Sequence, residues 1–187
     1  SLILELDTWV LRRSCEQAVQ YAEQMQHGYI SVNLSGRQFA QEDAFDLVSR
    51  TLEQTGLPPE RLQIEITEGV VMANPSYTAE LLANFQAMGI SIAIDDFGTG
   101  YSSLAYLHRF SADVLKLDQS FIAEVRKGEN GGRIVRAIAA MAGELGLRVV
   151  AEGLEHPSEG QLLYELGSRY GQGYCYGRPR SAAALFT

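Results

Sequence analysis

The chain contains 187 residues, of which 46% are hydrophobic and 20% are charged, and this composition is typical of a soluble globular protein with one sizeable core. The formal net charge of −8 argues against a general nucleic-acid-binding protein, because such proteins present a basic face to phosphates. No apolar run approaches the roughly 20 residues of a membrane-spanning helix, and the first residues lack the pattern of a signal peptide. With only two cysteines, Cys15 and Cys175, the sequence predicts buried thiols in a reducing, cytoplasmic location rather than a disulfide framework.

Six short segments read as strands, and segments with helical periodicity lie between most of them. In chain order, the expected elements are a helix over 9–25, a strand over 29–34, a helix over 44–55, a strand over 62–67, a helix over 77–88, strands over 90–95 and 114–118, a helix over 133–145, a strand over 147–152, a helix over 159–166 and a strand over 170–176. Two glycines disfavour a regular strand in the last segment. The alternation of strands and helices predicts parallel βα units.

The faces of the strands favour a barrel over an open doubly wound sheet. In the strand at 90–95, isoleucines occupy every second position, whereas small or polar residues occupy the others, and the strands at 29–34 and 62–67 follow a similar rule. An open sheet covered by helices would be apolar on both faces. A (β/α)8 barrel needs eight strands and about 250 residues, so roughly 60 residues are expected to be missing, at the N-terminus. We therefore expect residues 1–187 to form one domain, an N-terminally incomplete α/β barrel with about six of its eight units.

Polar residues follow the predicted strands, at the end where barrel enzymes carry their active sites. They are Asn33, Glu65, Asp95, Asp96, Lys116, Asp118, Glu152 and Gln172. Carboxylate and amide oxygens suit Mg²⁺, Mn²⁺ or Ca²⁺, and a zinc site is disfavoured because none of the three histidines ends a strand. Asp95 could bridge two ions in a phosphoester-cleaving centre, and Lys116 could hold a phosphate oxygen or orient the attacking water.

Each of these residues also has a structural interpretation when it is taken alone. Asn33 could cap a turn, Lys116 and Asp118 could form an internal ion pair, and Glu152 could cap a helix that starts near Pro157. Tyr174, Met72 and Cys175 are expected to pack rather than to act as ligands. The coincidence of polar groups at six strand ends favours a functional site over these separate explanations.

The sequence is similar to a known family over residues 9–179. The matching segments are VNLS at 32–35, EITE at 65–68, DDFGTGYSSL at 95–104, KLDQSF at 116–121, AEGLE at 151–155 and QGY at 172–174. In this order they closely resemble the EAL domain, the bacterial phosphodiesterase that cleaves cyclic di-GMP to linear pGpG. The resemblance implies a modified TIM barrel with one antiparallel strand and a centre of two Mg²⁺ or Mn²⁺ ions, with Ca²⁺ as an inhibitory occupant.

The resemblance also implies roles for individual residues. The residues implied as metal ligands are Asn33, Glu65, Asp95, Asp96 and Glu152, and those implied in catalysis are Lys116, Glu152 and Asp96. Contacts with the dinucleotide or its surroundings are implied for Ser35, Arg37, Glu155 and Gln172. Glu68 is implied to anchor a mobile loop that begins at Gly98. It further implies a homodimer formed through a helix over 104–110, and an adjoining sensor or GGDEF domain.

The chain departs from the family pattern in one important respect, because the tripeptide Glu-Ala-Leu does not occur in it. In the family, that glutamate is a metal ligand. Gln119 and His156 are smaller departures. Two functions therefore remain open: a metal-dependent cyclic di-GMP phosphodiesterase, favoured by the retained downstream residues, or a catalytically inactive cyclic di-GMP receptor or dimerisation module.

Overall fold

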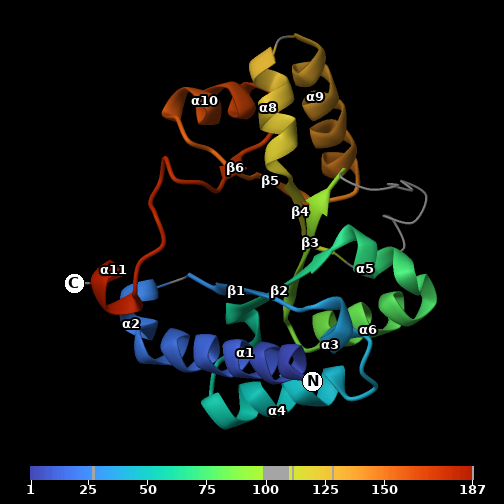
Figure 1. Ribbon diagram of the computed structural model, residues 1–187, viewed down its shortest axis with the longest axis vertical. Helices are drawn as coiled ribbons and strands as arrows, with labels where there is room; N and C mark the ends of the chain where they lie inside the picture. The colour runs from blue at the N-terminus through green and yellow to red at the C-terminus, as the bar shows by residue number, and fades with distance from the viewer. Residues whose placement is uncertain (27, 99–109, 111, 128, 187) are drawn as a thin grey trace.

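A computed structural model describes residues 1–26, 28–98, 110, 112–127 and 129–186. Six strands pair in chain order, and every pair is parallel. They are β1 (Ile30–Asn33), β2 (Leu62–Thr67), β3 (Ser91–Phe97), β4 (Val114–Leu117), β5 (Arg148–Ala151) and β6 (Tyr170–Gly171). Figure 1 shows that the sheet curves into a half-barrel with helices outside it. The expected incomplete α/β barrel is confirmed; the antiparallel strand that the resemblance implies is not among these six strands.

The strand register explains the two faces of the sheet. Val32, Ile64 and Ile92 are aligned on adjacent strands and are buried in the core beneath the helices. Because side chains alternate along a strand, the residues between them point to the concave side. There, Glu65 and Lys116 are buried yet charged. The strands therefore place their apolar side chains against the helices and their polar side chains inside the half-barrel.

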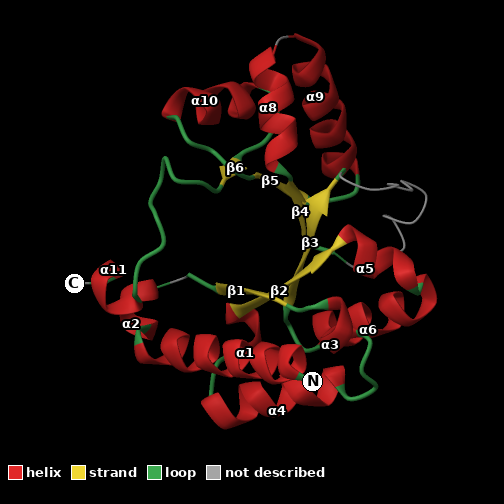
Figure 2. Ribbon diagram, in the orientation of Figure 1, coloured by secondary structure: helices red, strands yellow, loops and turns green. Residues whose placement is uncertain are grey.

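Helices cover the convex side of the sheet, except for α11 at the end of the chain (Figure 1). The helices are α1 (Leu2–Gln20), α2 (Ala22–Met25), α3 (Gly36–Phe39), α4 (Ala44–Thr55), α5 (Glu68–Ala73), α6 (Pro75–Ala87), α8 (Gln119–Lys127), α9 (Glu129–Glu144), α10 (Pro157–Glu165) and α11 (Ala182–Leu185), with a 3₁₀ turn at Pro59–Arg61. Figure 2 shows α1 beside β1 and β2, with α4 next to α1, and α8 and α9 beside β4 and β5. None of the described helices is long and apolar enough to cross a membrane.

The C-terminal segment crosses the open side of the half-barrel. It runs from β6 to α11, which lies next to α2 at the other end of the sheet (Figure 1). The rings of Tyr21 and Phe186 stack there with their centroids 5.1 Å apart. This contact ties the end of the chain to its first helices.

The sequence-based expectations agree with most of these elements and miss some of them. The expected strand over 170–176 is wrong in extent, because β6 ends at Gly171 and the chain then turns, with the Tyr176 amide donating to the Gly173 carbonyl at 3.1 Å. A Cβ at Gly173 would overlap the backbone of Leu154, which explains why glycine stands in this turn. The short helix α5 and the helix α8 were not expected. Except for Phe110, which is buried, the expected dimerisation helix lies outside the described residues.

Candidate metal centre at the strand ends

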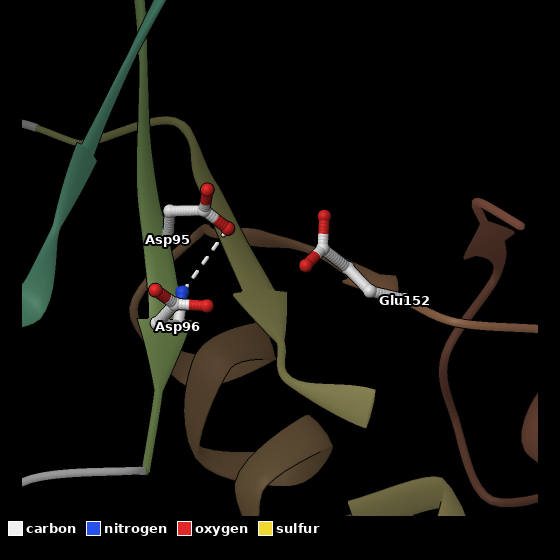
Figure 3. Close-up of side chains that lie close together, drawn as sticks. All are labelled: Asp95, Asp96 and Glu152. Carbon is white, nitrogen blue, oxygen red and sulfur yellow. Dashed lines mark hydrogen bonds between the residues drawn. The ribbon is translucent and has the colours of Figure 1, made fainter. Parts of the chain in front are cut away.

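A bulge in β3 brings two adjacent aspartates to the same side of the strand. Ile94 pairs with Leu115 and Phe97 pairs with Leu117, so β3 has one more residue than β4 between these two pairs. The extra residue breaks the alternation of side chains. Asp96 adopts the left-handed region with φ 54°, and its amide donates to Oδ1 of Asp95 at 3.0 Å. Figure 3 shows that the two carboxylates consequently lie close together.

A third carboxylate approaches this pair from the next strand but one. Glu152 follows the end of β5, and Figure 3 shows its carboxylate pointing across the gap toward Asp95. Asp95, Asp96 and Glu152 each offer an oxygen, and these oxygens all lie within 4.8 Å of one another. Burial raises the pKa of Asp96, and the neighbouring charges of Asp95 and Asp118 raise it further. The cluster thus concentrates negative charge that a cation would neutralise.

Lys116 lies among the carboxylates on the concave side of the sheet. Its ammonium nitrogen is 2.6 Å from Oε2 of Glu65, 2.6 Å from Oε1 of Glu152 and 3.3 Å from Oδ1 of Asp95. Burial alone would lower the pKa of Lys116, but its hydrogen bonds to Glu152 and Glu65 raise it above its ordinary value. The pKa of Glu152 is also raised, because the penalty of burial outweighs the stabilisation from Lys116.

Glu65 joins the cluster to the first strand. Glu65 is 5% exposed, and its Oε2 accepts from the side-chain amide of Asn33 at 3.4 Å as well as from Lys116. Its other oxygen, Oε1, accepts a hydrogen bond from the hydroxyl of Ser31. Asn33, Glu65, Asp95, Lys116 and Glu152 are therefore connected directly, although they come from five strands or strand ends.

This donor set fits a divalent cation. All of the candidate ligand atoms are oxygens, which hard ions such as Mg²⁺ and Mn²⁺ prefer. Three of the carboxylates already share one positive group, the Lys116 ammonium, in the described arrangement. Uncompensated carboxylates at such short range repel one another strongly, so a site of this kind requires positive charge.

A cleft of about 380 Å³ opens beside the carboxylates. Two of the residues that the resemblance assigns to the ligand line it, Glu155 and Gln172, together with Asp96 and Glu152. Glu155 is exposed, and its carboxylate lies 3.9 Å from the guanidinium of Arg126. The cleft is therefore an open space in which a ligand can approach the cluster.

Two further assigned residues, Ser35 and Arg37, lie after the end of β1. The hydroxyl of Ser35 donates to Asp7 and accepts from the amide of Gln38 at 3.2 Å, so it caps α3. Arg37 is exposed on α3. Within the part of the chain that the structure describes, the hydrogen bonds of Ser35 and Arg37 do not reach the cluster, and their binding role stays a prediction.

Glu68 begins α5, directly after β2, and is buried. Its Oε2 accepts a hydrogen bond from the amide of Gly98 at 3.1 Å. Gly98 has φ +92°, and a Cβ there would overlap the ring of Phe121. The segment that the resemblance describes as a mobile loop lies outside the described residues beyond Gly98, so the anchoring role of Glu68 stays a prediction.

The structural interpretations of single residues do not hold for Asp118 and Glu152. The ion pairs of Lys116 lead to Glu65, Asp95 and Glu152, whereas Asp118 accepts from the amide of Ser120 at 2.9 Å in the first turn of α8. The cap of α10 is made by His156 and Glu159 rather than by Glu152.

Two residues that line the cleft, Tyr174 and Gln119, were not expected to take part in the site. Tyr174 was expected to pack in the interior, but it is 54% exposed, and Arg178 lies over its ring at 4.7 Å from the centroid. The turn that shortens β6 carries Tyr174 out of the sheet. Its position two residues after Gln172 was the available signal.

The comparisons with known proteins agree with this geometry. A family model described as EAL domain matches residues 1–179. The chain is 41% identical over 185 residues to the Pseudomonas aeruginosa protein named cyclic di-GMP phosphodiesterase NbdA, covering 98% of this chain and 24% of that protein. It is 40% identical over 185 residues to MucR of the same organism, named a bifunctional diguanylate cyclase/cyclic di-GMP phosphodiesterase, covering 98% of this chain and 27% of that protein. The chain thus spans about a quarter of the length of these curated relatives.

Solved structures extend the agreement to the fold. The phosphodiesterase structure of MucR in complex with c-di-GMP superimposes with a TM-score of 0.93 at 39% identity, over 98% of this chain and 75% of that one. A manganese and cy-diGMP complex of Klebsiella pneumoniae BlrP1 superimposes with a TM-score of 0.85 at 29% identity, over 94% of this chain and 45% of that one, and a calcium complex of BlrP1 is also known. Since the family model covers nearly the whole chain and the half-barrel matches these structures, the chain belongs to the EAL domain family.

Proposed function

We propose that this EAL domain hydrolyses a phosphodiester bond of cyclic di-GMP to give linear pGpG. The observation that carries the proposal is the convergence of Asp95, Asp96 and Glu152 around Lys116, next to an open cleft. The names of NbdA and MucR support cyclic di-GMP as the substrate. Residues 1–187 would then act as one EAL domain in the bacterial cytoplasm.

The candidate ligands would hold two Mg²⁺ or Mn²⁺ ions. Asn33, Glu65 and Asp95 would hold one ion, Asp95 and Asp96 the other, and Glu152 would complete the shell. When bound, such a pair of ions lowers the pKa of a coordinated water and stabilises charge on the phosphoryl oxygens. The manganese and calcium complexes of BlrP1 support this class of ion, and we propose that Ca²⁺ occupies the centre without supporting turnover.

Lys116 and Glu152 would have complementary roles, as hydrogen-bond donor and as proton acceptor. The ammonium of Lys116 can only donate hydrogen bonds, so it would orient the attacking water or hold a nonbridging phosphate oxygen. The carboxylate of Glu152 can accept a proton from that water. Asp96 would help to position the attacking water. Gln172 and Glu155, which line the cleft, would contact the dinucleotide together with Ser35 and Arg37.

Hydrolysis of cyclic di-GMP by the purified protein tests the proposal. We expect pGpG with Mg²⁺ or Mn²⁺, and none with Ca²⁺ or without a divalent ion. Glu152→Gln, which preserves size but removes the proton acceptor, should abolish the product. Binding of the dinucleotide without pGpG under either metal would contradict the proposal and favour the second candidate, an inactive receptor.

We also propose a homodimer that uses the segment 104–110, and an adjoining sensor or GGDEF domain. The bifunctional name of MucR supports the second of these partners. Sedimentation of the protein with and without the dinucleotide tests the dimer, and a strictly monomeric species would exclude it.

A further inference from the structure

A row of hydrogen-bonding side chains lies inside the half-barrel, one layer below the carboxylate cluster. Ser31 of β1, Gln63 of β2 and Ser91 of β3 are aligned by the strand register, so they face the same side at the same height. Glu65 is two residues after Gln63 on β2 and therefore points to the same side, one step closer to the strand ends. The row thus lies directly beneath a candidate metal ligand.

The hydrogen bonds in this row all run in one direction. Ser91 donates to the amide oxygen of Gln63 at 3.3 Å, and the amide nitrogen of Gln63 donates to the hydroxyl of Ser31 at 2.9 Å. The hydroxyl of Ser31 in turn donates to Oε1 of Glu65. Because a serine hydroxyl has one proton, the bond that it accepts from Gln63 leaves that proton free to be donated to Glu65.

This arrangement distinguishes the two oxygens of Glu65. Oε1 faces the interior layer and is bound to Ser31, whereas Oε2 faces Lys116 and Asn33 at the strand ends. Gln63 is 3% exposed and Glu65 is 5% exposed, whereas Ser31, on the edge strand β1, is exposed, so the carboxylate is shielded from water while the hydroxyl that holds it remains accessible. A carboxylate fixed at one oxygen offers the other in a defined direction, as in metal sites where outer hydrogen bonds orient the ligands.

We propose that Ser31 and Gln63 are positioning residues of the metal centre, and that they hold Glu65 so that Oε2 alone points to the ion. The proposal rests on the proposed metal-dependent function. Neither residue touches the substrate in this proposal: Ser31 acts through Glu65, and Gln63 acts through Ser31. Loss of the Ser31 hydroxyl would let the carboxylate rotate and would weaken the ion's hold on it.

Mn²⁺ affinity tests the proposal without relying on turnover. Free Mn²⁺ is measured by its electron paramagnetic resonance signal as the ion is titrated into the wild-type protein, Ser31→Ala, Ser31→Thr and Gln63→Leu. Ser31→Ala should raise the dissociation constant for Mn²⁺ by about tenfold, the size usual for loss of an outer hydrogen bond. Ser31→Thr keeps the hydroxyl and should bind nearly as well as the wild type, and Gln63→Leu should weaken binding less than Ser31→Ala.

Ser168→Ala is the matched control. Ser168 is 3% exposed and shares its hydroxyl proton between the carbonyls of Val149 and Tyr170, outside the row, so the same substitution there removes a hydrogen-bonded hydroxyl away from the cluster. Thermal unfolding of each variant accompanies the titrations. We expect Ser168→Ala to lower the unfolding temperature more than Ser31→Ala while leaving Mn²⁺ affinity unchanged.

The outcomes separate the two proposals. Three results would overturn the positioning role without contradicting the metal centre. They are wild-type Mn²⁺ affinity in Ser31→Ala, failure of Ser31→Thr to restore Mn²⁺ binding, and an equal loss of Mn²⁺ affinity in Ser168→Ala. A wild-type protein that binds no Mn²⁺ would overturn the metal-dependent function itself, and the positioning role with it.

Discussion

The ammonium group of Lys116 lies 2.6 Å from a carboxylate oxygen of Glu152, and the two residues come from neighbouring strands of the half-barrel. The same group also contacts Glu65 and Asp95. One buried cation is therefore shared by three carboxylates. This lysine neutralises the centre when no other cation does so, and the stability of the protein should depend on it.

Removing the charge of Lys116 should destabilise the metal-free protein. In Lys116→Met, the three carboxylates lose their shared partner, and loss of one partner from a buried ion pair costs about 3–5 kcal/mol. We expect a loss of this size in the free energy of unfolding, measured by urea denaturation at pH 7 with a chelator present. Because the proposed ion site exists only in the folded state, and its carboxylates lack their counter-charge in Lys116→Met, Mn²⁺ should stabilise the variant more than the wild type.

Arg12→Met provides the control for that loss. Arg12 pairs with Glu16 on the surface of α1, where both side chains are well exposed, and such pairs contribute less than about 1 kcal/mol. If Lys116→Met were as stable as Arg12→Met in the absence of metal, Lys116 would not be the counter-charge of the cluster.

Asp95 is expected to matter for turnover rather than for folding. Asp95→Asn keeps the size of the side chain but removes the charge that would bridge two ions, so the rate of pGpG formation should fall by orders of magnitude. The circular dichroism spectrum and the unfolding midpoint should stay close to those of the wild type. Chromatographic measurement of pGpG at saturating Mn²⁺ checks the first expectation, and near-normal turnover would contradict the two-ion assignment.

The sequence was sufficient to predict the fold class and the general position of the site. Alternation of isoleucines with polar residues in the strand at 90–95 indicated one polar and one apolar face, and parallel strands bring their carboxyl ends to one rim. This is why the sequence alone predicts that Glu65, Lys116 and Glu152, far apart in the chain, lie together.

Local geometry could not be predicted in the same way. In a regular strand, Asp95 and Asp96 would point to opposite faces, and only the bulge and the left-handed φ of Asp96 bring them together. Whether an adjacent pair forms a bulge depends on pairing with β4, which no local pattern encodes. For the same reason, the row formed by Ser31 and Gln63 depends on strand register rather than on any sequence motif.

The thiol of Cys15 should be unreactive toward alkylating reagents in the folded protein. Its side chain is fully buried in α1, and burial raises the pKa of its thiol to about 11, so little of the reactive thiolate exists at pH 8. Iodoacetamide at pH 8 followed by peptide mass spectrometry should therefore find modification at Cys175, which is partly exposed, well before Cys15. In urea, both cysteines should react at similar rates, and equal rates in the folded protein would contradict the burial of Cys15.

The raised pKa of the Cys15 thiol also predicts that the protein loses stability at alkaline pH. A thiol whose pKa is raised by folding ionises more readily in the unfolded chain, so its contribution to stability falls as the pH rises from about 8.5, the ordinary value, toward 11. Cys15→Ala removes this contribution and should show a smaller fall in the unfolding midpoint between pH 8 and pH 10.5. An identical fall in both proteins would assign the alkaline loss to other groups.

Asp96 should show a conflict between stability and metal binding. Its pKa is raised by burial and by Asp95, which means that its charge opposes folding when no metal is present. Asp96→Asn removes that charge, and asparagine tolerates a φ of 54°. We therefore expect a higher unfolding midpoint than the wild type in chelator, together with weaker Mn²⁺ binding.

Asp96→Val separates the backbone from the charge. It also removes the carboxylate, but a β-branched residue is strained in the left-handed region, so it should be less stable than Asp96→Asn by about 1–2 kcal/mol. Urea denaturation of both variants in chelator measures this difference. Equal stabilities would mean that the chain leaves the left-handed conformation at this position easily, and the bulge would then not be what holds the two aspartates on one side of β3.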